Sequence, residues 1–270
     1  MKQRFKTAAV LITILVGSFL ISKYAFYAVL VAATVLSMYE YNRLIIGDKT
    51  VTKSILPCLF TLLLVLGSYF YPQYIFHVYV LGCLVLFSFD MWENKDESIE
   101  KKADRCVYAA WGLTYIGLFM SLALRFLFIE NGLYIMLPTI LTVILCDSAA
   151  YFIGIKYGKH KIYPSISPKK SVEGTVAGFI TAVIVFACTL FVTKNIVFTN
   201  KPLFYLTGGA MIGVIGQLGD LAASLIKRRY NVKDFSNLLP GHGGMLDRID
   251  SQLFALSCMY VWASLIMGIK

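Results

Sequence analysis

The chain has 270 residues, of which 58% are hydrophobic and 15% are charged, against about 25% charged residues in ordinary soluble domains. This composition excludes a soluble globular domain and predicts an integral membrane protein. The net charge of +10 would suit nucleic acid, but the placement of the cations described below does not. Six cysteines are scattered, mostly inside apolar runs and without a Cys-x-x-Cys pair, so neither a disulfide framework nor a zinc site is expected.

Apolar runs recur along the whole chain at lengths that suit membrane-spanning helices. Crossing about 30 Å of hydrocarbon takes roughly 17–25 helical residues. The first run follows Lys2, Arg4 and Lys6 as a signal peptide would, but no Ala-x-Ala-like cleavage site follows it, so we expect it to remain a span. The predicted fold is all-α and polytopic, with about nine spans at residues 7–22, 24–41, 55–71, 74–91, 107–124, 133–154, 174–193, 203–226 and 252–269.

Lysine and arginine alternate in abundance from one connection to the next. The N-terminus and the connections after spans 2, 4, 6 and 8 hold 20 of the 25 cations. Cytoplasmic loops carry an excess of these residues, so the pattern predicts a cytoplasmic N-terminus and a C-terminus on the far side. The cations then face anionic lipid heads and nucleotides, and nucleic acid is not expected as a partner.

The first five spans contain no pattern that indicates chemistry. Glu40 and Asp90 lie at predicted span ends, where a solvated carboxylate is ordinary, and residues 92–105 are expected to form a surface helix or loop. We therefore predict a transmembrane scaffold at residues 1–124 and a transmembrane catalytic region at residues 125–270.

Span 6 and the loop after it carry polar residues in unusual places. Asp147 lies inside an apolar helix, where a charge costs about 2.5–3.5 kcal/mol and needs a partner or a polar cavity. Pro168 then precedes Lys169 and Lys170, beside the predicted start of span 7. A lysine pair at a helix N-terminus can cradle phosphate, although positive charge on the cytoplasmic side explains the same lysines.

Span 8 combines glycines with a polar stripe. The glycines at 208, 209, 213, 216 and 219 have the spacing of closely packed membrane helices. Asp220, Ser224 and Lys227 fall at i, i+4 and i+7, so they share one face of the helix that runs toward the cytoplasm. Carboxylates deep in this stripe and cations at its mouth suit a metal with phosphates above it.

The densest polar passage of the chain is residues 224–250, which read SLIKRRYNVKDFSNLLPGHGGMLDRID. Its cations suit phosphate and its carboxylates suit Mg²⁺. The glycines around His242 let backbone N–H groups approach an anion. Asp247, Asp250 and Ser251 follow at i, i+3 and i+4 where span 9 begins, whereas His77 and His160 are expected to be structural. The passage predicts metal-assisted phosphate chemistry at a membrane surface.

The same passage resembles the signature of the CDP-diacylglycerol synthases (phosphatidate cytidylyltransferases). The resemblance rests on Ser-x-x-Lys-Arg from Ser224, Lys-Asp from Lys233, and Pro-Gly-His-Gly-Gly-x-x-Asp-Arg-x-Asp from Pro240. Upstream, residues 147–154 and 167–174 look like two further blocks of that family, with Ser148 and Ser171 where threonine is common. The resemblance covers the chain from Asp147 onward.

The resemblance implies a nucleotidyltransferase that joins CTP to phosphatidic acid in phospholipid biosynthesis, giving CDP-diacylglycerol and pyrophosphate. It further implies Mg²⁺ as cofactor, with a monovalent cation such as K⁺ as a second candidate ion. The enzyme would lie in the cell inner (plasma) membrane with its active site facing the cytoplasm, in contact with the bilayer and as a homodimer.

The expected site residues fall into three roles. Asp220, Asp247, Lys227, Arg228 and His242 are expected to be catalytic, and Asp220, Asp247 and Asp250 to bind metal. Substrate binding is assigned to Asp147, Ser167, Lys169, Lys170, Ser224, Lys233, Asp234, Gly243, Gly244 and Arg248.

Two other functions fit parts of the pattern. The first is a CTP-dependent kinase of polyisoprenoid alcohols, which would transfer the γ-phosphate to a hydroxyl. The second is an ion-coupled secondary transporter that uses Asp147 and Asp220. The position of the polar motif, largely in a predicted cytoplasmic loop and not at mid-membrane, argues against the transporter.

Overall fold

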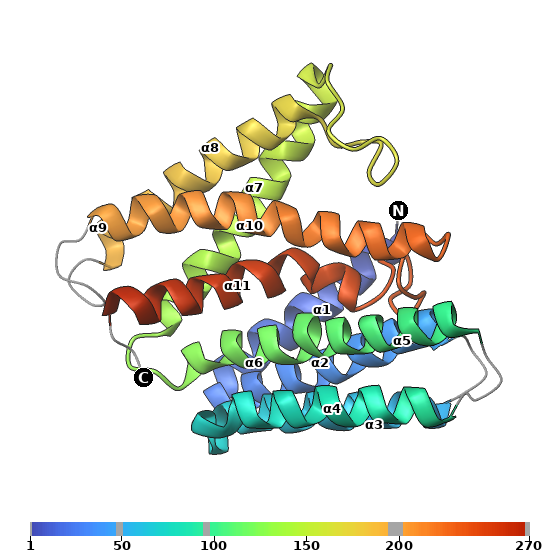
Figure 1. Cartoon of the computed structure of the whole chain (residues 1–270). Helices are drawn as coiled ribbons and strands as arrows, with labels where there is room; N and C mark the ends of the chain where they lie inside the picture. Colours follow the sequence, from blue (N-terminus) through green and yellow to red (C-terminus); the bar gives the residue numbers. More distant parts are fainter. Residues whose placement is uncertain (1, 47–50, 94–97, 194–201, 268–270) are drawn as a thin grey trace. The chain divides into compact units, whose positions relative to one another are not determined.

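The computed structural model describes residues 2–46, 51–93, 98–193 and 202–267 (Figure 1). Over these ranges the regular secondary structure is helical, and extended pairing is limited to isolated bridges at Lys161–Ser171 and Leu239–Gly243. The prediction of an all-α fold is confirmed.

The helices follow the predicted spans in order. A 3-10 turn, η1 Pro72–Tyr74, precedes α4, and a π-helical turn at Leu113–Leu118 joins α5 to α6, which ends in a 3-10 turn at Arg125–Leu127. The bounds are α1 Lys2–Ile21, α2 Lys23–Ile46, α3 Val51–Phe70, α4 Ile75–Glu93, α5 Ile99–Gly112, α6 Phe119–Leu124, α7 Leu133–Tyr157, α8 Val172–Cys188, α9 Leu190–Thr193, α10 Pro202–Arg229 and α11 Leu246–Met267.

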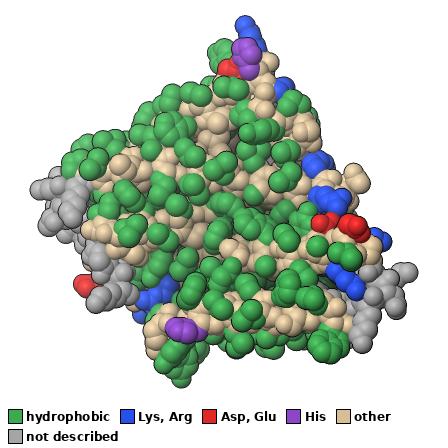
Figure 2. All heavy atoms as spheres, viewed as in Figure 1, with side chains coloured by type: hydrophobic (Ala, Val, Ile, Leu, Met, Phe, Trp, Pro, Cys, Tyr) green, Lys and Arg blue, Asp and Glu red, His purple; other side chains and the backbone are tan. Residues whose placement is uncertain are grey.

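Apolar helices long enough to cross a membrane dominate the described chain. Seven helical segments qualify by length and hydropathy, and two shorter apolar helices, Ala9–Ile21 and Ser54–Phe70, match the remaining predicted spans. Large apolar side chains are exposed on them, including Val176, Ile180 and Ile184 of α8, and hydrophobic side chains cover much of the face in Figure 2. Exposed apolar side chains suit the hydrocarbon of a bilayer. Helices also suit it, because they satisfy their own backbone hydrogen-bonding groups. The chain is a multi-pass membrane protein.

The fifth span is longer than its hydropathy indicates. Residues 92–105 were expected to form a surface helix or loop; α5 begins among them at Ile99, and its helical path continues to Leu127. Ile99, Glu100 and Lys101 are exposed, so the start of α5 is a surface helix that is continuous with the fifth span.

The chain divides into two compact units. The first comprises Met1–Leu124 with Val232–Ile249, and the second comprises Arg125–Asn231 with Asp250–Lys270. The boundary after residue 124 coincides with the expected end of the scaffold. The polar segment 232–249, which was expected to belong with the catalytic region, groups with the first unit.

In the first unit, tyrosines tie the helices together. The Tyr27 hydroxyl of α2 donates to the carbonyl of Val65 in α3 at 2.6 Å, and the Tyr41 hydroxyl donates to the carbonyl of Tyr108 in α5 at 2.9 Å. A Cβ on Gly112 would lie 2.4 Å from the Tyr41 ring, so α5 can approach α2 only because residue 112 is glycine. These bonds fix the part of α2 that carries Glu40.

In the second unit, glycines bring the helices into close contact. A Cβ on Gly174 of α8 would lie 2.5 Å from the Ala150 carbonyl oxygen of α7, and one on Gly209 of α10 would lie 2.9 Å from the Val183 Cα of α8. A Cβ on Gly219 would lie 2.9 Å from the Asp250 carbonyl oxygen of α11. Small residues permit this approach in lipid, and the predicted packing role of the span 8 glycines is confirmed there.

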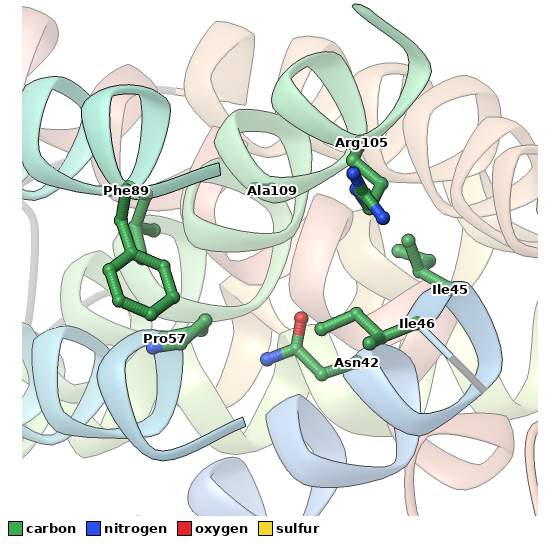
Figure 3. A pocket seen from close by; sticks show the side chains of 8 residues that line it. Asn42, Ile45, Ile46, Pro57, Phe89, Arg105 and Ala109 are labelled. Carbon is green, nitrogen blue, oxygen red and sulfur yellow. The ribbon is translucent and has the colours of Figure 1, made fainter. Parts of the chain in front are cut away.

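The first unit also encloses a narrow cavity of about 10 Å³ (Figure 3). It is lined by Asn42, Pro57, Phe89, Arg105 and Ala109, among others. The buried Nδ2 of Asn42 has no hydrogen-bond partner among the described residues. A space of this size holds about one water molecule, which would satisfy that nitrogen.

Candidate functional site

The polar loop, residues 232–246, is folded around the carboxylate of Asp247. Oδ2 of Asp247 accepts hydrogen bonds from the backbone N–H groups of Phe235 at 2.8 Å and Gly244 at 3.0 Å. Asp247 lies in the first turn of α11, where a negative charge also favours the helix dipole. One carboxylate therefore joins both ends of the polar loop to the start of α11.

The glycines of the polar loop are required by its backbone. Gly241 and Gly243 have φ values of 76° and 79°, which L side chains rarely adopt. The turn is closed by the Leu239 N–H donating to the Gly243 carbonyl at 2.9 Å and by the His242 N–H donating to the Leu239 carbonyl at 2.8 Å. A Cβ on Gly243 would lie 3.1 Å from Oδ2 of Asp247 and 3.2 Å from Oδ1 of Asp234. Two acids thus lie directly against this turn.

Glu40 of α2 holds the polar loop from a distant part of the sequence. Oε1 of Glu40 accepts from the Ser236 hydroxyl at 2.6 Å and the Met245 N–H at 2.9 Å, while Oε2 accepts from the Leu246 N–H at 3.0 Å. The Glu40 side chain is 3% exposed. The expectation of a solvated carboxylate at a span end was wrong.

The sequence contains a signal that would have found Glu40. The predicted second span ended at residue 41, but α2 continues to Ile46, which places Glu40 inside the helix. A carboxylate inside an apolar helix needs a partner or a functional role. On the loop side, Gly244 leaves room for this carboxylate, because a Cβ on residue 244 would lie 2.7 Å from Oε2 of Glu40.

The second unit contains a separate charged cluster. Nζ of Lys170 lies 2.8 Å from Oδ2 of Asp220 and donates to the Gln217 carbonyl at 3.3 Å. Asp147 of α7 is near enough to Lys170, to Asp220 and to Ser251 of α11 to interact with them electrostatically. Helices α7 and α10 therefore bring Asp147 and Asp220 close to one lysine.

The loop between α7 and α8 presents Lys170 to α10. Ser171 caps α8 by accepting from the Gly174 N–H at 3.2 Å, and the His160 ring contacts Glu173 at 2.6 Å, which gives His160 a structural partner. The carbonyl of Ile166 accepts from Nε of Arg228 at 3.1 Å. Lys169 is exposed, whereas Lys170 is half-buried against α10.

The predicted polar stripe of span 8 lies on one continuous helix, α10. Asp220 and Ser224 are half-buried on it, and Arg228 is exposed. Lys227 is 8% exposed, so its side chain is packed inside the protein and is not displayed at an open mouth.

The structure distributes the expected site residues over both units. The polar loop and the start of α11, in the first unit, hold Lys233, Asp234, His242, Gly243, Gly244, Asp247 and Arg248. The second unit holds Asp147, Ser167, Lys169, Lys170, Asp220, Ser224, Lys227, Arg228 and Asp250.

The residues that could hold a metal are carboxylates. Within the described ranges, no group of three or more His, Cys, Asp or Glu side chains gathers as a metal site. Asp220 and Asp247 offer hard oxygen atoms of the kind Mg²⁺ prefers, and Asp250 lies one helical turn after Asp247 on α11. Nδ1 of His242 is buried, with no hydrogen-bond partner among the described residues. The donor chemistry fits Mg²⁺ better than zinc.

Comparison with known proteins agrees with these features. The model of the cytidylyltransferase family matches residues 2–266. Phosphatidate cytidylyltransferase of Bacillus subtilis is 46% identical over 115 residues, which cover 42% of this chain and 41% of the relative. The protein of the same name from Staphylococcus haemolyticus is 41% identical over 132 residues, covering 49% and 50%. That from Thermotoga maritima is 36% identical over 159 residues, covering 58% of each chain.

The matched part thus spans about half the length of these curated relatives. The family match extends over nearly the whole chain, from the first helix to the last. On this evidence the chain belongs to the cytidylyltransferase family.

Proposed function

We propose that this protein transfers the cytidylyl group of CTP to phosphatidic acid, giving CDP-diacylglycerol and pyrophosphate. The observation that carries the proposal is the polar loop, ordered by Glu40 and Asp247, in a membrane chain of the cytidylyltransferase family. The names of the relatives support the same substrates.

The reaction places demands that these residues meet. A phosphate oxygen of phosphatidate attacks the α-phosphorus of CTP; a new P–O bond forms, and the bond to the bridging oxygen of the β-phosphate breaks to release pyrophosphate. The nucleophile is already an anion, so no strong general base is needed, and the main barrier is repulsion between anions. Positioned cations lower that barrier.

Lys170 is the cation whose surroundings support such a role most directly. Asp220 holds the Lys170 ammonium at 2.8 Å, which fixes its position beside α10. In the proposal, Lys169, Lys227 and Arg228 contribute further positive charge, and His242 lies at the phosphates. The remaining substrate contacts come from Asp147, Ser167, Ser224, Lys233, Asp234, Gly243, Gly244 and Arg248.

We propose Mg²⁺ as the cofactor, with Asp220 and Asp247 as ligands and Asp250 as a further carboxylate of the site. When bound, the ion would neutralise charge on the triphosphate. A monovalent cation such as K⁺ is proposed as a second ion. The role of Asp247 as a hydrogen-bond acceptor, described above, is compatible with this, since a carboxylate has two oxygen atoms and about four lone-pair sites.

The site is proposed to face the cytoplasm from the inner membrane, where CTP is available. The lysine and arginine alternation supports this orientation. We also propose a homodimer, although the α10 glycines contact helices of their own chain, so their spacing is no argument for a second copy.

Labelled CTP tests the proposed reaction. The protein in lipid vesicles, supplied with phosphatidate, Mg²⁺ and CTP, should transfer label from the α-phosphate into lipid and none from the γ-phosphate. Label from the γ-phosphate in a polyisoprenoid alcohol would instead identify the kinase. Nucleotide-independent ion transport by the same vesicles, without lipid labelling, would identify a transporter.

A further inference from the structure

An apolar groove lies between α8 and α10 in the second unit. Its cavity measures about 340 Å³, within the roughly 300–1,000 Å³ of typical ligand pockets. The walls are formed by Val176 and Phe179 of α8 and by Val214, Leu218 and Leu221 of α10. Both helices belong to the membrane-spanning set, so the groove lies where lipid is the solvent.

The groove has a closed apolar end and a polar end. Toward the middle of the two helices, Gly213 and Phe179 close it, because a Cβ on Gly213 would lie 3.2 Å from the Phe179 Cα. Toward the start of α8, the lining includes Tyr163 and Lys170 of the preceding loop. The Lys170 ammonium there pairs with Asp220 at 2.8 Å. The groove therefore runs from an apolar interior to the charged cluster.

This polarity matches an anionic lipid with one hydrocarbon chain. Val176, Val214 and Leu218 are 50%, 48% and 47% exposed, so the walls are open to a chain entering from the side. Nε2 of Gln217, which also lines the groove, donates to the backbone carbonyls of Thr175 at 3.2 Å and Gly213 at 2.8 Å. Apolar walls of this kind suit an alkyl chain.

We propose that this groove holds one acyl chain of phosphatidate and so sets the lipid phosphate beside Lys170. The assignment rests on the proposed function and adds the place where the lipid substrate is anchored. The chain fills the apolar length between α8 and α10, and the headgroup meets the ammonium at the polar end. Complementary charge at one end and apolar surface along the rest fix both the direction and the depth of the lipid.

Variants that narrow the groove test the assignment. Val176→Phe and Val214→Phe each place a ring into it, and Ile180→Phe adds the same ring to an exposed position of α8 outside the lining. The probe is the transfer of α-phosphate label from CTP to dioleoyl phosphatidate or to dihexanoyl phosphatidate, with the full-length protein in detergent or vesicles. We expect the two groove variants to lose about tenfold in rate with the long-chain lipid and less than about twofold with the short-chain lipid. Ile180→Phe should match the unmodified protein with both lipids.

The rate with the short-chain lipid shows that each variant is folded. Unchanged rates with both lipids would overturn the groove assignment. If a groove variant loses activity with both lipids, the test is photocrosslinking of the unmodified protein with a phosphatidate that carries a diazirine on one acyl chain. Its covalent adducts should fall within residues 172–180 and 210–222, and adducts confined to other helices would overturn the assignment. Absence of α-label in every phosphatidate would remove the proposed function, and the groove assignment with it.

Discussion

Two carboxylates, Glu40 and Asp247, organise the polar loop at the scale of single residues. Each accepts backbone N–H groups that the loop cannot satisfy by itself, three of them at Met245, Leu246 and Gly244 where the chain enters α11. A buried donor that loses its acceptor costs about 1–3 kcal/mol. The geometry of the proposed active site therefore depends on a helix far away in the sequence.

Replacing Glu40 tests this dependence. In Glu40→Gln, one carboxylate oxygen becomes an NH₂ group that faces a backbone donor, so we expect the free energy of unfolding to fall by about 1–3 kcal/mol and transfer activity to fall with it. Thermal unfolding in detergent and the α-label assay measure the two effects. Glu130→Gln, at an exposed carboxylate, is the control. Equal behaviour of the two variants would remove the positioning role of Glu40.

Replacing Asp247 by asparagine tests its role in metal binding separately from its role in the structure of the polar loop. Asp247→Asn keeps an oxygen that can accept from Phe235 and Gly244 but loses the negative charge. We expect near-normal thermal stability and a loss of Mg²⁺-dependent transfer of at least about 10- to 100-fold, because the amide is a poor ligand for Mg²⁺. A Mg²⁺ titration of the rate is the measurement. Near-normal turnover with an unchanged Mg²⁺ dependence would show that Asp247 is not a ligand.

Lys170 is the cation with the most specific surroundings. Lys170→Met removes the ammonium beside Asp220 while keeping the length of the side chain, and the rate of transfer should fall by about 100-fold, the usual loss when a positioned donor is removed. Lys101→Met, at an exposed lysine of α5, should have little effect. Similar losses of transfer rate in both variants would show that Lys170 has no specific role in the reaction and contributes only to membrane orientation.

At the scale of elements, the contact between α7 and α8 positions Asp147 and Lys170. Gly174 and Gly178 lie against the carbonyl oxygens of Ala150 and Cys146, and the hypothetical Cβ distances are 2.5 Å and 3.0 Å. Backbone atoms cannot move aside as a side chain tip can. The distance between these helices, and with it the charged cluster, depends on the absence of two methyl groups.

A pair of alanine substitutions tests this packing. Gly174→Ala should force α7 and α8 apart and lower the free energy of unfolding by about 1–3 kcal/mol, as overpacking of a tight contact does. Gly67→Ala in α3 is the control, because nothing lies within 4 Å of the added Cβ, and it should be neutral or stabilising by up to about 1 kcal/mol. Thermal unfolding of both purified variants gives the comparison. Equal melting temperatures would contradict the packing argument.

At the scale of the whole molecule, the helices and the cation alternation agree on one topology. The seven long segments and the two shorter apolar helices of the described chain cover all predicted spans. An odd number of crossings places the two ends on opposite sides, as the alternation also requires. The connections that carry Lys169 and Asn237 are separated by two crossings, so they should lie on the same side.

Cysteine labelling tests that topology. In a background without the six native cysteines, Lys169→Cys and Asn237→Cys should both react with a membrane-impermeant thiol reagent only from the cytoplasmic side. Both residues are exposed, so accessibility does not limit the reaction. Labelling of the two positions from opposite sides would overturn both the topology and the proposed Mg²⁺ site of Asp220 and Asp247.

The sequence by itself determined the helices, the membrane class and most of the candidate residues. A chain in hydrocarbon must satisfy its backbone groups within each span, so apolar runs of sufficient length become helices whatever their neighbours are. The order of polar residues from Ser224 to Asp250 was likewise legible, because a motif is local. The predicted fifth span began at residue 107, whereas the helix begins at Ile99, because a helix can continue through exposed polar residues such as Glu100 and Lys101.

Only the tertiary structure decided which polar residues meet. Glu40 bonds to residues about 200 positions away, Lys170 pairs with Asp220, and Lys227 is buried despite its place in a cationic run. Such contacts depend on how closely helices approach, which glycines such as Gly112 and Gly174 set through backbone distances that no local pattern encodes. The groove between α8 and α10 has the same origin, because it is a space between two helices and belongs to neither sequence alone.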